Sequence, residues 1–173
     1  MSTSLLTEIV RQFSIEDDEV TKINFFEVID RITGDRVEYL QRKFYEANVD
    51  LPFIWNWDAD TLFVMERANL IDDLLFALAE RLPHDQVEAA LKRAMTPLEL
   101  LAIKLPSSGD YPEYSEYLRA CVKTVLDSRL PILRESYVGN SFRLNKQALG
   151  DVIVDSFQEQ WLRELLATIP VYP

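Results

Sequence analysis

The sequence predicts an all-α protein, a single domain over residues 1–173 built as a helical array or bundle of about six to eight helices. Only four glycines occur in 173 residues, and apolar residues recur at spacings of three and four, the period of an amphipathic helix. Strand-like alternation is hard to find. The length fits one domain, and 48% hydrophobic residues are enough for a substantial core.

The first helix is expected over residues 3–13, where apolar residues gather on one side. A second helix is expected to begin at Asn24. Asn24 and Glu27 have the spacing of a capping box, and Ile23 and Val28 have that of a hydrophobic staple.

Gly34 predicts a break or bend in that helix, followed by a further helical segment over residues 35–48. Residues 49–57 are predicted to be non-helical because Pro52 removes a backbone donor and biases its neighbour toward an extended conformation. A long central helix is expected near residues 59–82, since its apolar residues form a wide stripe.

Two further helix starts follow Pro83, which ends the central helix. Asp85 and Glu88 have capping-box spacing and predict a short helix to about residue 95. The clearest start in the chain is Thr96-Pro97-Leu98-Glu99, because it combines an N-cap, a proline at the first helical position and a glutamate at the third.

The C-terminal part predicts two more long segments. One helix is expected over residues 112–128, and Pro131 is expected to interrupt helical structure after it. A long C-terminal helix is expected near residues 145–168, capped by Asn145, with a strong apolar stripe. Parts of this helix and of the central helix should form the centre of the fold.

Composition excludes several function classes. The net charge of −11 and the pI near 4.6 disfavour direct binding to nucleic acid, whose phosphates attract Lys and Arg, and to an anionic membrane surface. Charge interrupts the apolar runs well short of the ~20 residues that span a membrane. Cys121 is the only cysteine and cannot form an internal disulfide, so a reducing, cytoplasmic location is expected.

Familiar catalytic motifs are absent from the sequence. His84 is the only histidine and Cys121 the only cysteine, whereas structural zinc needs four nitrogen or sulfur ligands. Neither a glycine-rich phosphate loop nor a nucleophile elbow is present. We expect His84 to be an exposed junction residue and Cys121 to pack in the core.

Carboxylates are the only abundant groups suited to catalysis or metal binding. Because they can bind magnesium, a magnesium-dependent nucleotide hydrolase is an alternative function. Two acidic pairs have the letters that the MazG group of all-helical pyrophosphohydrolases places on packed helices: Glu16-x-x-Glu19 and Glu27-x-x-Asp30. Only seven residues separate them, too few for two packed antiparallel helices. A second set on one helical face is Glu66, Asn69 and Asp73. A solvated face explains both sets more simply, so no catalytic, cofactor or metal residue is predicted.

The first sixty residues differ from the rest. They hold thirteen acidic and six basic residues, a net charge of −7, against −4 for the other 113, and nine of the nineteen aromatic residues. The aromatic side chains in segment 53–57, Phe53, Trp55 and Trp57, either pack over the core or anchor an interface with a partner. The candidate partner-binding residues are Glu16, Asp17, Asp18, Glu19, Phe53, Trp55, Trp57, Asp58 and Asp60.

The leading functional hypothesis is a non-enzymatic protein–protein interaction protein: an adaptor, assembly factor or structural subunit that presents this acidic, aromatic surface. The expected partners are proteins, with a basic protein and self-assembly both left open. One alternative is an acidic inhibitor or nucleic-acid mimic that occupies a basic groove. The other is the magnesium-dependent hydrolase.

Overall fold

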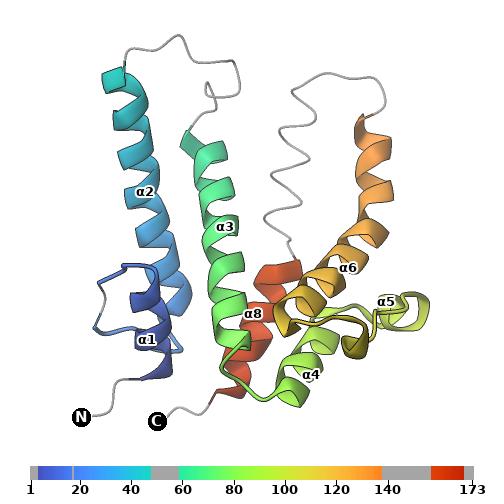
Figure 1. Ribbon diagram of the computed structural model, residues 1–173. Helices are drawn as coiled ribbons and strands as arrows, with labels where there is room; N and C mark the ends of the chain where they lie inside the picture. The colour runs from blue at the N-terminus through green and yellow to red at the C-terminus, as the bar shows by residue number, and fades with distance from the viewer. Residues whose placement is uncertain (1–3, 17, 48–58, 138–156, 170–173) are drawn as a thin grey trace.

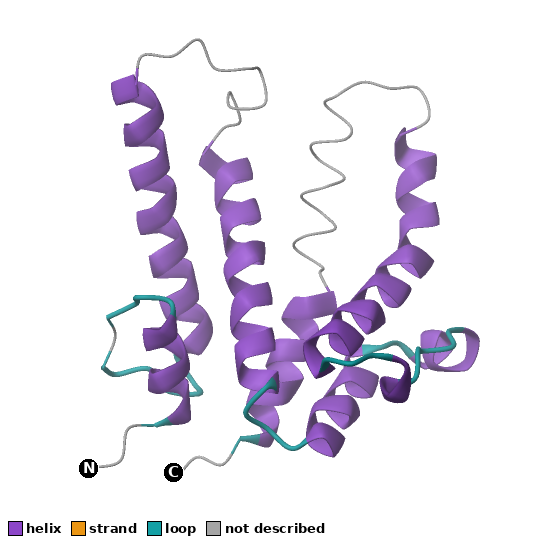
Figure 2. Ribbon diagram, in the orientation of Figure 1, coloured by secondary structure: helices purple, strands orange, loops and turns teal. Residues whose placement is uncertain are grey.

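Helices are the only regular elements in the part of the chain that the structure describes (Figures 1 and 2). The computed structural model describes residues 4–16, 18–47, 59–137 and 157–169. Seven α-helices and a short 3₁₀ helix in these ranges confirm the predicted all-α class. They are α1 (Leu5–Gln12), α2 (Phe25–Ala47), α3 (Ala59–Ala79), α4 (His84–Ala94), α5 (Pro97–Ala102), η2 (Ser108–Asp110), α6 (Tyr114–Tyr137) and α8 (Phe157–Thr168).

Two long antiparallel helices, α2 and α3, pack side by side, with α2 at one edge of the molecule and α3 near its middle (Figure 1). The helix α3 confirms the predicted long central helix, and its second half supplies fully buried side chains such as Leu70, Leu74 and Leu75. The short helix α1 packs against α3, where Arg81, just beyond α3, donates to Glu8 at 3.1 Å. The helix α3 therefore contacts both α1 and α2.

The helix α8 lies at the centre of the core and contacts α3, α4 and α6. Phe157, Trp161, Leu162 and Leu165 are completely buried. The indole Nε1 of Trp161 donates to the backbone oxygen of Val87 in α4 at 3.0 Å, so this large side chain is buried without losing its hydrogen bond. Residues 157–168 confirm the corresponding part of the predicted C-terminal helix, and residues 145–156 lie outside the described residues.

An ion-pair network joins α2, α3 and α8, and its two central side chains, Arg67 and Glu159, are largely buried. Two guanidinium nitrogens of Arg67 in α3 donate to the two carboxylate oxygens of Glu159 in α8, both at 3.0 Å. Arg67 Nε also donates to Asp30 in α2 at 2.6 Å, and Arg163 donates to Glu159 at 3.0 Å. Burial alone would raise the pKa of Glu159, but the hydrogen bonds from Arg67 and Arg163 lower it below its usual value.

The start of α2 differs from the predicted capping arrangement. Asn24 directly precedes α2, but its side chain turns back, accepting from the backbone N–H of Thr21 at 2.6 Å and donating to the oxygen of Glu19 at 3.0 Å. The staple of Ile23 on Val28 is wrong, because Ile23 is 95% exposed while Val28 is buried. The connection after α1 therefore fixes the entry to α2 through polar bonds.

Of the other two predicted capping boxes, one is formed. Thr96 accepts from the backbone N–H of Glu99 at 3.1 Å, and the Glu99 carboxylate accepts from that of Thr96 at 2.9 Å. The box at Asp85 and Glu88 is wrong, since α4 starts two residues earlier than this box requires, with Pro83 at its N-cap and no side-chain cap. The Asp85 carboxylate instead accepts the N–H of the next residue.

Two predicted breaks are also wrong. The helix α2 runs without interruption through Gly34, and α6 continues past Pro131 to Tyr137. A glycine lowers helix stability by about 1 kcal/mol relative to alanine and a proline by about 3 kcal/mol. Neither cost ends a helix of 23 or 24 residues, because a long helix keeps the hydrogen bonds of its other turns.

Replacing Gly34 by alanine should therefore stabilise the protein by about 0.5–1 kcal/mol. A Cβ atom at Gly34 meets no atom within 4 Å, so only the backbone entropy of the unfolded chain changes. Chemical denaturation measures the free energy of unfolding. Gly109 has equally open space but lies in η2, so Gly109→Ala is the control and should give a smaller gain. A loss of stability in Gly34→Ala would contradict a regular helix at this position.

Candidate interaction surfaces

The structure describes four of the nine residues predicted to bind a partner. Glu16, Asp18 and Glu19 are exposed on the segment between α1 and α2. Asp60 lies in the first turn of α3. The remaining predicted residues lie outside the described residues; they are Asp17, Phe53, Trp55, Trp57 and Asp58.

The acidic segment is partly neutralised by its own surroundings. Arg11 at the end of α1 donates to the carboxylate of Asp18. Glu19 is also engaged in an interaction. Of the three acidic residues described here, Glu16 alone has no bonded partner in the described structure. The surface is therefore less uniformly negative than the sequence predicts.

A single residue in the left-handed region shapes this segment. Ser14 follows α1 with φ of 60°, a conformation that ends helices and that glycine adopts more readily. Its backbone N–H donates to the oxygen of Arg11 at 3.0 Å. The turn buries Ile15 in the core and leaves Glu16 exposed beside α2.

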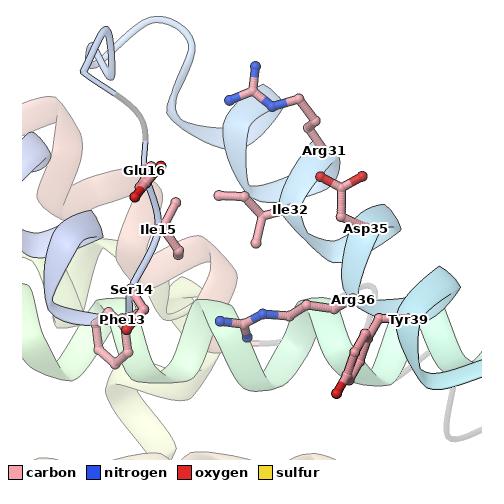
Figure 3. Close-up of a pocket in the computed structure, with 9 residues that line it drawn as sticks. All are labelled: Phe13, Ser14, Ile15, Glu16, Arg31, Ile32, Asp35, Arg36 and Tyr39. Atoms are coloured by element: carbon pink, nitrogen blue, oxygen red, sulfur yellow. The ribbon is translucent and has the colours of Figure 1, made fainter. Parts of the chain in front are cut away.

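A groove opens between this segment and α2, and we name it the α1–α2 groove (Figure 3). Its volume is about 330 Å³. Its lining combines apolar and aromatic side chains with two acids and two arginines: Phe13, Ser14, Ile15, Glu16, Arg31, Ile32, Asp35, Arg36 and Tyr39. In Figure 3 the side chain of Arg36 extends from α2 toward Ser14 and Phe13. Glu16 and Asp35 are exposed, and neither forms an ion pair within the described residues.

A second surface lies on α5, which has no buried residue although half of its residues are leucines. Leu98 is 75% exposed and Leu101 is 88% exposed, and Leu100 is also exposed. Figure 1 shows α5 at the edge of the molecule, on the side away from α1 and α2. We name Leu98 and Leu101 the α5 tip. The sequence does not distinguish these leucines from core residues, because spacing reports which residues share a helical face and not what covers that face.

Polar interactions hold α5 in place. Arg129 in α6 donates to both carboxylate oxygens of Glu99, each at 2.8 Å, and its guanidinium lies 5.6 Å from the ring centroid of Phe157. The hydrogen bonds from Arg129, aided by those from Thr96, lower the pKa of Glu99 to about 2. Because the Arg129–Glu99 pair is bidentate, it fixes the orientation of α5 as well as its position.

Two lysines flank the α5 tip. Lys92 lies in the last turn of α4, and Lys104 lies two residues beyond α5. Both are exposed, and neither forms an ion pair within the described residues, whereas Arg93 pairs with Glu164 at 3.2 Å. The exposed leucines of the α5 tip are thus flanked in the sequence by two exposed lysines, in a protein of net charge −11.

The sole histidine and the sole cysteine of the sequence both lie in described helices. His84 is exposed, as predicted, and stacks on Tyr114 with ring centroids 3.6 Å apart. Cys121 is buried, as predicted, and burial raises the pKa of its thiol. Within the described ranges, His, Cys, Asp and Glu nowhere gather in a group of three that could hold a metal ion. No helix in those ranges has both the length and the apolar character needed to cross a membrane.

Arg129→Gln should raise the pKa of Glu99 from about 2 toward its ordinary value of 4.5. Because the folded pKa is lowered, Glu99 stabilises the fold fully above pH 4.5, and this contribution is lost as the pH falls toward 2. The wild type should therefore lose stability more steeply than Arg129→Gln across that window.

An NMR titration of the Glu99 carboxyl carbon, combined with unfolding curves at several pH values, measures both effects. Arg119→Gln is the matched control, since it removes an arginine of α6 that pairs with Asp72 instead. A Glu99 titration near 4.5 in the wild type would contradict the strength of this ion pair.

Comparison with known proteins gives no family for this chain. No family model, curated protein or solved structure matches it. Function is therefore inferred from the chemistry and exposure of the described residues.

Proposed function

We propose that this protein is a non-enzymatic protein–protein interaction protein, an adaptor or assembly factor, and that the α5 tip is part of its contact surface. One observation carries the proposal. The helix α5 buries none of its side chains, yet a capping box and the Arg129–Glu99 ion pair hold it so that Leu98 and Leu101 face solvent. Side chains that are fixed in place and exposed are suited to binding.

The energetics support contact at this tip. Burying a leucine side chain contributes about 1.5–3 kcal/mol, so two leucines can supply ~3–6 kcal/mol before the costs of association. A few buried side chains of this kind carry most of the binding energy in measured interfaces. Because Glu99 and Arg129 already fix the helix, little conformational entropy remains to be lost on binding.

The acidic inhibitor or nucleic-acid mimic has less support. A mimic needs an array of free carboxylates, whereas Asp18 is paired with Arg11 and Glu19 is engaged. We place the proposed activity in a reducing compartment, the cytoplasm, with support from the single, buried cysteine.

Leu98→Ser combined with Leu101→Ser should remove partner binding while leaving stability within about 0.5 kcal/mol, because both side chains are exposed. The wild type and the double variant are each recovered from native lysate, and bound chains are identified by mass at low and high salt. The wild type should retain a partner in high salt that the double variant loses.

Ile23→Ser is the matched control, since it removes another exposed apolar side chain outside α5 and should keep the partner. Identical sets of bound chains for the wild type and the double variant would contradict a role for the α5 tip. A partner that every variant keeps at low salt and loses at high salt would support acidic mimicry instead.

A further inference from the structure

We propose that the partner is a second copy of this chain, with the α5 tip of one copy bound in the α1–α2 groove of the next. This assignment rests on the proposed function, because it names the occupant of the same tip. It follows from three kinds of complementarity between two surfaces of one molecule: apolar shape, charge and helix-end polarity.

The apolar parts of the two surfaces match. The groove offers Phe13 and Ile32, both half-buried, and the exposed ring of Tyr39. Its volume of about 330 Å³ is at the lower end of the ~300–1,000 Å³ of ligand pockets, which suits a few side chains better than a whole domain. Leu98 and Leu101 are three residues apart and so lie on one face of α5.

Among the two acids and two arginines of the groove, the two carboxylates, unpaired in the described structure, match the lysines on either side of α5 in the sequence. Glu16 and Asp35 line the groove, Lys92 and Lys104 flank α5, and none of the four forms an ion pair within the described residues. From residue 92 to residue 104 the chain has three basic residues and one acidic residue, a net charge of +2, whereas the first sixty residues carry −7. A symmetric contact of α5 with α5 would instead bring the lysines of two copies together, which is unfavourable.

The groove also holds two arginines, Arg31 and Arg36, and α5 has groups that can accept hydrogen bonds from Arg36. The last carbonyl oxygens of a helix have no partner within the helix and attract cations. The chain already uses this chemistry at the end of α8, where Lys22 donates to the oxygens of Ala167 at 3.4 Å and Ile169 at 3.0 Å. Arg36 would act in the same way on the C-terminal end of an inserted α5.

The two surfaces cannot meet within one copy. Figure 1 places α1 and α2 on one side of the molecule and α5 at the opposite edge. A contact between different surfaces of two copies is heterologous, and it repeats until the chain of copies closes into a ring or grows as a filament. The mass of the assembly should therefore rise with concentration beyond that of a dimer.

A complementation experiment tests this arrangement by light scattering during size-exclusion chromatography. The tip variant, Leu98→Ser with Leu101→Ser, keeps an intact groove. The groove variant, Glu16→Lys with Asp35→Lys, keeps an intact tip. Each alone should be monomeric, and an equal mixture should form a heterodimer that grows no further, because only one tip and one groove remain functional.

The controls separate this result from unfolding and from net charge. Glu116→Lys with Asp127→Lys changes the net charge as much as the groove variant does, at exposed positions on α6, and should assemble like the wild type. Lys92→Glu with Lys104→Glu leaves the leucines in place and should raise the concentration for half-assembly by about tenfold. Mixing it with the groove variant should restore assembly, since the charges are then exchanged. Circular dichroism confirms the fold of each variant.

A wild type that stays monomeric at every concentration overturns the assignment, and so does a groove variant that assembles normally. The proposed function fails separately, when the tip variant keeps every partner recovered from lysate. If the wild type is monomeric but binds a lysate partner that the tip variant loses, the assignment of a second copy as the partner is overturned and the proposed function stands.

Discussion

The contact between Arg67 and Glu159 is the constraint on which the rest of the structure depends. It joins residues 92 positions apart and connects three helices, because Arg67 also binds Asp30. Glu159 is only 9% exposed, so removing either charge would leave its partner in a poorly hydrated place. The pair therefore favours the one arrangement of α2, α3 and α8 in which every charge is bonded.

Both interaction surfaces depend on this arrangement. On one side, α8 positions α4 through the bond from Trp161 to Val87, and Phe157 of α8 lies beneath the guanidinium that holds Glu99 of α5. On the other side, the network holds α2, whose outer face forms one wall of the α1–α2 groove. The ion-pair network around Arg67 thus helps to fix two surfaces at opposite edges of the molecule.

The sequence predicts the helices better than it predicts their exposure. Periodicity identifies α3, and the capping box at Thr96 is formed as expected because both partners are three residues apart. Local signals fail at Gly34 and Pro131, where long helices tolerate an unfavourable residue. The exposure of the α5 tip and the partners of Arg67 are not predicted for another reason. Both depend on which distant helix contacts a residue, and no local sequence pattern specifies that.

A double-mutant cycle on Arg67 and Glu159 tests the central claim most directly. Arg67→Met and Glu159→Gln are made singly and together, and chemical denaturation gives the free energy of unfolding for each. We predict that each single change costs about 3 kcal/mol and that the double variant costs clearly less than the sum, since no buried charge is left unpaired. Additive losses, or single losses below about 0.5 kcal/mol, would contradict the view that this ion pair holds the fold together.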